Sequence, residues 1–379
     1  MIKKARTIGF PRMKQEVGEK RIFLPEFINQ LLALGFVICI EEGYGSRLGF
    51  SEELYMLGDP RVRMCSREEC FAQDYVMILR APKNEDFDLI KPGACLISML
   101  HFPTRPKRVR LLKQKKINAI SLDSITDDTN LRLIENMKAV AWNGLEAAFD
   151  IFEARSGTLL RKDNSPWKTL ILGTGMVGKH AVAAATKLGN TERYNDQIRE
   201  NGAGNIAISV GRATTSKPGL MKQLFQEADI LVDSAYRRDT SQPIVPNEWI
   251  SWLPEHAVIV DLAVDPYTLD ANPPVVRGIE GIPQGNLDQY VFEPDDPNWE
   301  RTVPEVIPSK NRRTTVTCYS WPGIHPETCM RHYARQLLPL MEVLAKKDYD
   351  KLSPQGNYFE RALYRGTLKA FLNIAKDLP

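Results

Sequence analysis

The first 130 residues alternate short apolar runs with segments of helical length. The apolar runs read ARTIGF, FVICIEE, YVMILRAP, ACLISML and INAISL, and helical patterns cover residues 27–34 and 108–115. Strands separated by helices usually pair in parallel, because the chain crosses back over the sheet before each new strand. The runs YVMILR and CLISML are continuously apolar, as expected for strands covered on both faces. The pattern therefore predicts an α/β domain whose strand-end loops are available for chemistry.

A helical pattern over residues 130–152 leads into the most informative stretch, WKTLILGTGMVGKHAVAAATKL at residues 167–188. An apolar run there meets Gly173, Gly175 and Gly178 in G-x-G-x-x-G spacing, and an Ala-rich helix follows. The first glycine permits a sharp turn, the second lets a pyrophosphate approach the backbone, and the third lets the helix pack on the strand. Such turns also close ordinary strand–helix units, but the context here favours a dinucleotide site. Its predicted contacts are Gly173, Thr174, Gly175, Met176, Val177 and Gly178.

The next predicted strand, residues 205–210, ends without the acidic residue that usually binds the ribose 2′-hydroxyl of NAD. Arg212 follows it, with hydroxyl groups nearby at Thr214 and its neighbours. A guanidinium with hydroxyl groups suits a 2′-phosphate, so NADP is slightly preferred and NAD stays open. Arg212 could equally be a solvated turn residue.

Further strands are predicted at residues 228–236, 256–265 and 314–319, and helical patterns at 332–344 and 359–376 close the chain. We expect these last helices to pack on the first domain, which would then be discontinuous.

The sequence thus predicts an α/β protein with two Rossmann-like domains, parallel sheets and a cleft between the domains. The substrate domain would comprise residues 1–130 and 320–379, and the dinucleotide-binding domain residues 131–319.

Composition excludes several functional classes. The 379 residues suffice for two cores, and a net charge of +3 gives no field that would indicate nucleic acid or an anionic membrane. No apolar run approaches the roughly 18 residues of a spanning helix, and the N-terminus lacks an apolar signal core. We therefore expect a soluble, cytoplasmic protein that binds small molecules, and leave homo-oligomer formation open.

The six cysteines are scattered without C-x-x-C spacing. This spacing predicts neither a disulfide nor a zinc site, and no other metal site is expected. Cys39 and Cys95 lie in apolar runs, where we expect free thiols that behave as small hydrophobic groups.

His101 follows the apolar run CLISML, and the strand ends of α/β sheets are where ligands bind. Its ordinary pKa of about 6.5 suits general acid–base catalysis. Arg21 and Arg80 could clamp a carboxylate at the same edge. The plainer interpretation is that His101 bonds backbone and that the arginines are solvated or paired. The basic run at residues 106–116 is interpreted as the solvated face of a helix.

The order of motifs resembles the superfamily of alanine dehydrogenase, saccharopine dehydrogenase and nicotinamide nucleotide transhydrogenase. The pieces that carry the resemblance are IGFPR with EKRIFLP, EEGYGSRLGFSEELY, ILRAP, KPGACLISMLH, the glycine motif, IVDLAVD and CYSWPGIHPE. The stretch HPETCMRHYARQLLPLMEVL is most similar to the saccharopine-forming branch.

The resemblance implies an enzyme that interconverts an amino acid or secondary amine with a 2-oxo acid through a nicotinamide cofactor. Arg21 would match the arginine that binds the substrate carboxylate, and His101 the histidine that acts as acid or base. Asp265 would match an acidic residue after a cofactor-domain strand. The residues facing the nicotinamide would be Ser320 and Trp321.

Arg80 departs from the pattern, because alanine and saccharopine dehydrogenases have a lysine there. A guanidinium cannot be deprotonated in a protein, so His101 would have to carry the proton chemistry. Two hypotheses stay open: an NAD(P)-dependent amino-acid or opine dehydrogenase, and a transhydrogenase-like or redox-sensing nucleotide-binding module without amino-acid chemistry. His101 favours the first hypothesis, and Arg80 favours the second.

Overall fold

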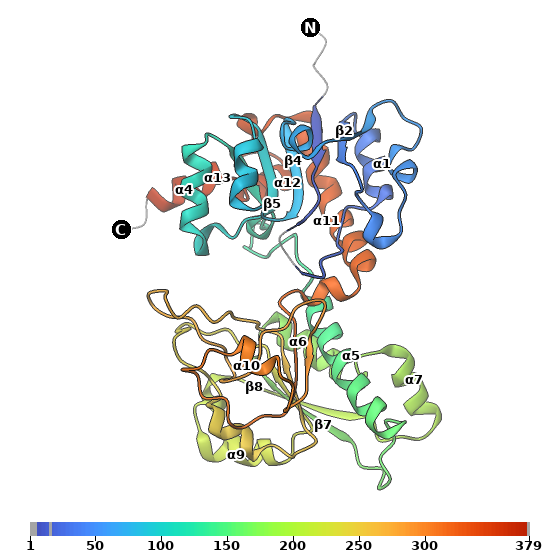
Figure 1. Ribbon diagram of the computed structural model, residues 1–379, viewed down its shortest axis with the longest axis vertical. Coiled ribbons are helices and arrows are strands. Elements are labelled where there is room, and N and C mark those ends of the chain that lie inside the picture. Colours follow the sequence, from blue (N-terminus) through green and yellow to red (C-terminus); the bar gives the residue numbers. More distant parts are fainter. Residues whose placement is uncertain (1–5, 15–16, 377–379) are drawn as a thin grey trace. The chain divides into compact units, whose positions relative to one another are not determined.

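The computed structural model describes residues 6–14 and 17–376, and the chain divides into two compact units. Unit 1 consists of Met1–Asn136 and His325–Pro379, and unit 2 of Met137–Ile324. Figure 1 shows the C-terminal helices, in red, beside the blue and cyan strands of unit 1. The chain therefore leaves unit 1, forms unit 2, and returns to complete unit 1.

Unit 1 contains a six-stranded parallel sheet. Its strands are β1 (Thr7–Phe10), β2 (Val37–Glu41), β3 (Val62–Cys65), β4 (Tyr75–Arg80), β5 (Cys95–Met99) and β6 (Asn118–Ser121). The spatial order β3-β2-β1-β4-β5-β6 changes direction between β1 and β4. Ligands of open α/β sheets bind beyond the carboxyl ends of the strands at such a point. Arg80 ends β4 and His101 follows β5, so both lie at this edge.

The strands of unit 1 are buried on both faces. In β4, Tyr75 and Met77 enter one core and Val76 and Ile78 enter the other, which confirms the interpretation of the continuous apolar run. The first core is completed by α1 (Pro25–Ala33), α11 (Pro326–Lys346) and α12 (Tyr358–Arg365), and the second by α4 (Pro106–Gln114) and α13 (Leu368–Lys376). Two short helices, α2 (Glu52–Met56) and α3 (Arg67–Phe71), come before and after β3 along the chain, and α3 contacts β1 and β2.

Unit 2 contains a second six-stranded sheet, in the order β11-β12-β10-β9-β7-β8. All pairs are parallel except β11 with β12. Its strands are β7 (Trp167–Leu172), β8 (Asn205–Val210), β9 (Ile230–Asp233), β10 (Val258–Asp261), β11 (Val291–Phe292) and β12 (Thr314–Thr317). The chain moves from β7 to β8 on one side and then to β9 on the other, so the glycine turn after β7 lies at the change of direction.

The helices of unit 2 cover both faces of its sheet. They are α5 (Met137–Ser156), α6 (Met176–Ala185), α7 (Thr191–Arg199), α8 (Arg212–Thr215), α9 (Pro218–Gln226) and α10 (Trp299–Thr302). Residues of α5 and α6 form one core, and residues of α9 form the other. The prediction of two Rossmann-like domains is confirmed. Across residues 6–14 and 17–376, no helix combines the length and the apolar character needed to cross a membrane.

Two predicted helices differ in extent from the observed ones. The long helix begins at Met137 instead of near residue 130, because the Asp127 carboxylate accepts hydrogen bonds from the backbone of Thr129 and Leu131 and stabilises a tight turn. The tail helix is interrupted before Leu368, where the Thr367 hydroxyl accepts a hydrogen bond from the backbone N–H of Ala370. In both places a short polar side chain competes with helix continuation.

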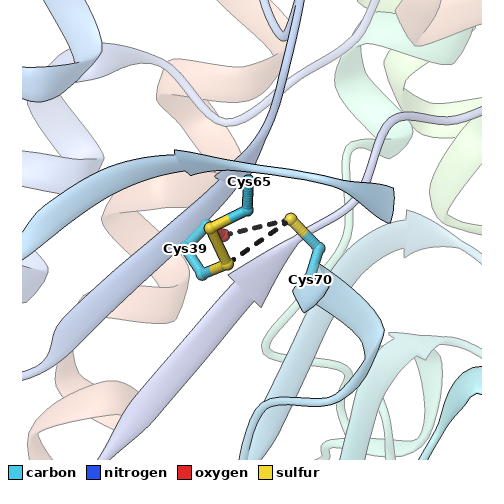
Figure 2. Close-up of side chains that lie close together, drawn as sticks. All are labelled: Cys39, Cys65 and Cys70. Carbon is cyan, nitrogen blue, oxygen red and sulfur yellow. Dashed lines mark hydrogen bonds between the residues drawn. A yellow bond between two sulfur atoms is a disulfide. The ribbon is translucent and has the colours of Figure 1, made fainter. Parts of the chain in front are cut away.

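The expectation of free cysteines was wrong for one pair. Cys39 in β2 and Cys65 at the end of β3 form a disulfide, and the thiol of Cys70 in α3 lies beside it (Figure 2). The strands are neighbours, with Cys39 opposite Arg63 and Glu41 opposite Cys65. No local spacing signals this pair, because it depends on the order of strands in the sheet. Cys95 is a buried free thiol, as expected.

Candidate functional site

The glycine turn after β7 has the geometry of a phosphate-binding turn. Gly173 has a φ of 114°, and a Cβ there would lie 2.7 Å from the Ser234 carbonyl oxygen. A Cβ on Gly178 would lie 2.2 Å from the Gly173 oxygen, whereas a Cβ on Gly175 would meet nothing within 4 Å. Protein packing thus explains two of the glycines. The third faces open space, as expected where a ligand approaches the backbone.

The first turn of α6 is accessible at this point. Thr174, Gly175 and Met176 are exposed. Gly175 occupies the N-cap position, so no side chain caps the helix there. Uncapped N–H groups at the N-terminus of a helix attract anions, and the helix dipole adds to that attraction. The turn therefore suits a dinucleotide pyrophosphate.

The end of β8 lies beside the glycine turn. A Cβ on Gly211 would lie 3.9 Å from Thr174 Cγ2, and the Ser209 hydroxyl donates to the Gly173 carbonyl oxygen at 3.0 Å. Arg212 is exposed and begins α8, with Thr214 half-buried in the same short helix. A cation therefore stands next to the turn.

A buried network of aspartates and arginines lies at the carboxyl ends of β9 and β10. Arg237 donates to Asp265 at 2.8 Å, and Arg277 pairs with Asp261. Asp265 is 31% exposed and lies four residues beyond β10. Asp265, the predicted acidic residue, is thus held by Arg237, a partner that no sequence pattern indicated.

Asp233 carries the remaining carboxylate of this network. Its Oδ1 atom accepts from the backbone N–H of Ala235 at 3.0 Å, and its buried Oδ2 atom has no hydrogen-bond partner among the described residues. Burial and the charge of Asp261 raise the pKa of Asp233 to about 7. The backbone of Ser234 and Ala235, which follow Asp233, packs against Gly173, and the Asp233 carboxyl group lies against Gly278.

Ser320 and Trp321 are buried, at 3% and 1% exposure. The Trp321 indole N–H donates to the Asp261 carbonyl oxygen at 2.8 Å, and its own carbonyl oxygen accepts from Asn143. The ring belongs to the core of unit 2. The expected contact between Trp321 and a nicotinamide ring stays a prediction.

In unit 1, His101 is paired with Asp123, a residue that the sequence analysis did not single out. Asp123 lies in a short 3-10 helix (Leu122–Ser124) directly after β6. Its Oδ2 atom lies 3.3 Å from His101 Nδ1, and its Oδ1 atom accepts from the His101 backbone N–H at 3.1 Å. The Ser121 hydroxyl also donates to Asp123, at 2.8 Å. The His101 side chain is 41% exposed, whereas that of Asp123 is 7% exposed.

Asp123 is ionised in this arrangement. Burial acts to raise its pKa, but the hydrogen bonds from His101 and Ser121 and the imidazole charge outweigh burial and lower the pKa to about 2. A buried carboxylate at Nδ1 fixes the ring orientation and favours a proton on that nitrogen. The other side of the imidazole is then suited to exchange a proton with a substrate.

Two arginines accompany His101 at this edge. Arg80 is in register with Met99, two residues before His101. Arg108 donates to the Leu100 carbonyl oxygen at 2.9 Å, and burial and the charges of Arg105 and Arg80 lower the pKa of Arg108. Arg108 is therefore half-buried near Arg80, and its predicted place on a solvated helix face was wrong.

Arg21 is buried and paired. Its Nε atom donates to Glu19 at 2.9 Å, and a second guanidinium nitrogen binds the other oxygen of the same carboxylate. Burial raises the pKa of Tyr333, while the charges of Arg21 and Arg80 act to lower it, so both guanidinium groups lie within electrostatic reach of this phenol. A cavity of about 20 Å³, roughly the size of one water molecule, adjoins Arg21 and is also lined by Arg12, Lys20 and Arg47.

The fold and the glycine turn define a protein with two Rossmann-like domains, the second of which has the turn of a dinucleotide-binding domain. Residues 12–141 match the family model described as "Alanine dehydrogenase/PNT, N-terminal domain", and residues 146–267 match "Alanine dehydrogenase/PNT, C-terminal domain". The matches cover more than half of the chain, which therefore belongs to the alanine dehydrogenase/PNT family. The predicted family resemblance is confirmed at this level.

Individual relatives are distant. NAD(P) transhydrogenase subunit alpha of Haemophilus influenzae is 24% identical over 285 residues, which cover 68% of this chain and 55% of that subunit. The chain thus spans about half the length of that relative. Alanine dehydrogenase of Bacillus subtilis is 25% identical over 271 residues, 68% of this chain and 70% of the enzyme.

Among solved structures, an L-alanine dehydrogenase is similar with a TM-score of 0.70 and 20% identity, over 95% of this chain and 94% of that chain. This similarity confirms the fold. The saccharopine-like branch stays a prediction.

Proposed function

We propose that this protein is an NAD(P)-dependent dehydrogenase that interconverts an amino acid or opine-type secondary amine with a 2-oxo acid. The observation that carries the proposal is the His101–Asp123 pair at the carboxyl edge of the sheet in unit 1. A nicotinamide nucleotide held at the glycine turn would accept or supply the hydride. His101 accepts a proton when the amine is oxidised and returns it in the reverse direction.

Because position 80 is an arginine, carboxylate binding and proton exchange fall to different residues in this proposal. A guanidinium stays charged, so Arg80 binds a carboxylate and His101 alone exchanges protons. Arg108 adds a second positive charge near Arg80, which favours a dicarboxylate-bearing substrate over alanine. The charge of Arg21 is offset by its ion pair with Glu19. Unit 1 would then be the substrate domain and unit 2 the cofactor domain. Arg212 and Thr214 favour NADP over NAD.

A second candidate function is a nucleotide-binding module without amino-acid chemistry. The replacement of the family lysine by Arg80 and the similarity to a transhydrogenase subunit support it. The test combines a panel of 2-oxo acids, ammonium or amine donors, and NADPH or NADH, read by absorbance. We expect nucleotide oxidation only when 2-oxo acid and amine are both present. Nucleotide binding without any turnover would favour the second function.

A further inference from the structure

Three cysteines from three elements meet in unit 1. The disulfide of Cys39 and Cys65 joins β2 to β3, and the Cys70 Sγ atom in α3 lies 3.8 Å from Cys39 Sγ (Figure 2). All three residues are at most 2% exposed and together form a small buried cluster. Cys39 is therefore next to both other sulfur atoms.

The position of Cys70 is fixed by its helix. Ser66 caps α3, because its hydroxyl accepts from the Glu69 N–H at 3.2 Å while the Glu69 carboxylate accepts from the Ser66 N–H at 2.9 Å. The backbone of Cys70 packs so tightly on β1 that a Cβ on Gly9 would lie 1.8 Å from the Cys70 carbonyl oxygen. The Cys70 thiol also lies 3.6 Å from the Cys39 carbonyl oxygen. The third thiol is thus held against the disulfide.

We propose that these residues form one thiol–disulfide exchange site in which Cys39 is the shared partner and Cys65 and Cys70 alternate. The Cys70 thiolate attacks Cys39 Sγ, a bond between Cys39 and Cys70 forms, and the bond between Cys39 and Cys65 breaks. Cys65 leaves as a thiolate and takes up the proton that Cys70 released. One disulfide and one thiol are present before and after, so the step consumes no oxidant or reductant.

The exchange changes which element is cross-linked to β2. In the observed state β2 is joined to β3, and after exchange it is joined to α3. Arg67 in the same helix donates to Glu41, Asp86 and the Arg12 carbonyl oxygen. The exchange would therefore cross-link α3 to β2, and α3 is the helix whose Arg67 holds the segment after β1 in place.

The surroundings of Cys70 make the exchange slow at neutral pH. Burial and the charges of Glu41 and Glu69 raise the pKa of the Cys70 thiol to about 12, although a backbone hydrogen bond at Phe10 and the charge of Arg63 act to lower it. Only the thiolate attacks a disulfide, so the exchange rate should rise about tenfold per pH unit below that pKa.

Tryptic peptide mapping without reduction tests the proposal, because trypsin places the three cysteines in separate peptides: residues 22–47, 64–67 and 68–80. Wild-type protein is held near neutral pH or at about pH 9.5, quenched in acid, and alkylated before digestion. We expect the Cys39–Cys65 linkage at neutral pH and a growing Cys39–Cys70 fraction at the higher pH. Absence of that fraction at both pH values would overturn the proposal.

Variants provide a second measurement. Each variant is equilibrated with oxidised glutathione. Cys65→Ser should then contain a Cys39–Cys70 disulfide, and Cys70→Ser should keep the Cys39–Cys65 disulfide. In Cys39→Ser, both remaining thiols of the cluster should be alkylated. Cys95→Ser is the matched control, because Cys95 is a buried free thiol of the same sheet, and its map should equal that of the wild type. A folded Cys65→Ser protein in which both Cys39 and Cys70 are alkylated would contradict the exchange.

Discussion

The imidazole of His101 and the carboxylate of Asp123 are neighbours through the register of two strands. Ser98 of β5 pairs with Ser121 of β6, so the residues just beyond the two strand ends face each other and place His101 Nδ1 3.3 Å from Asp123 Oδ2. A second histidine–aspartate pair lies in unit 2, where His256 Nε2 is 2.7 Å from Asp229 Oδ1. Asp229 directly precedes β9, and His256 lies two residues before β10. The molecule therefore provides an internal control for mutations of the first pair.

Replacing His101 with alanine should lower kcat by about 100-fold to 10 000-fold, the usual contribution of a general acid–base group. Dinucleotide affinity, measured by fluorescence titration, should be unchanged because the glycine turn belongs to unit 2. His256→Ala is the control and should retain wild-type kcat. Full turnover by His101→Ala would remove the histidine from the mechanism.

Replacing Asp123 with asparagine keeps the shape of the side chain but removes its charge. We expect kcat to fall by at least about tenfold, because a neutral amide no longer fixes the orientation and tautomer of the imidazole. The free energy of unfolding of the variant should also lack the contribution that ionised Asp123 makes in the wild type. The pKa is lowered in the folded state, so that stabilisation is present above about pH 4 and is lost as pH falls towards about 2. Denaturation of wild type and variant between these pH values measures this contribution as a difference in the pH dependence of the free energy of unfolding.

Gly175 and Gly178 of the turn should respond differently to alanine. Gly175→Ala adds a methyl group to open space, so the melting temperature should stay within about 2 °C while dinucleotide affinity falls. Gly178→Ala forces a Cβ against the Gly173 oxygen and should lower stability by several degrees. Unchanged dinucleotide affinity in Gly175→Ala would contradict a pyrophosphate at this turn.

Arg212→Asp should shift cofactor preference towards NAD by at least about tenfold in the ratio of kcat/KM values, because an acidic residue binds a ribose 2′-hydroxyl and repels a 2′-phosphate. Lys187→Asp makes the same charge change beyond the other end of α6 and should leave the ratio unchanged. An unchanged ratio in Arg212→Asp would show that the residue does not contact the ribose.

Wild-type stability should fall as pH rises from about 4 towards about 7, through the Asp233 carboxyl group. Its pKa is raised in the folded state, so the unfolded chain releases this proton first and ionisation favours unfolding over that range. In Asp233→Asn the stability should no longer fall over this pH range, so the variant should gain stability relative to the wild type near pH 8. Thermal denaturation of both proteins at several pH values measures this. The same slope in variant and wild type would assign the titration to another group.

The sequence was sufficient for features that depend on local patterns. The continuous apolar runs predicted strands covered on both faces, and the spacing of Gly173, Gly175 and Gly178 predicted the turn after β7. His101 was predicted as a site residue because it directly follows the apolar run CLISML, and the structure places it beyond the end of β5. In each case the signal lies within about ten neighbouring residues.

Features that depend on strand order were missed. Asp123 is linked to His101 by the pairing of β5 with β6, and Cys39 to Cys65 by the pairing of β2 with β3. The contact of Trp321 with a nicotinamide ring was implied by the family resemblance and stays a prediction, although its indole N–H is satisfied within the core. An aspartate directly after the run INAISL was a signal for Asp123 that could have been used.

The discontinuity of unit 1 has a consequence for how the protein is made. The ribosome completes Met137–Ile324 before it delivers α11, α12 and α13, so unit 2 can fold during synthesis while the first sheet still lacks the helices that shield much of its surface. The exposed strands can be covered only after α11, α12 and α13 have left the ribosome. Destabilising changes in the segment His325–Pro379 should therefore reduce the yield of folded protein far more than their distance from His101 would suggest.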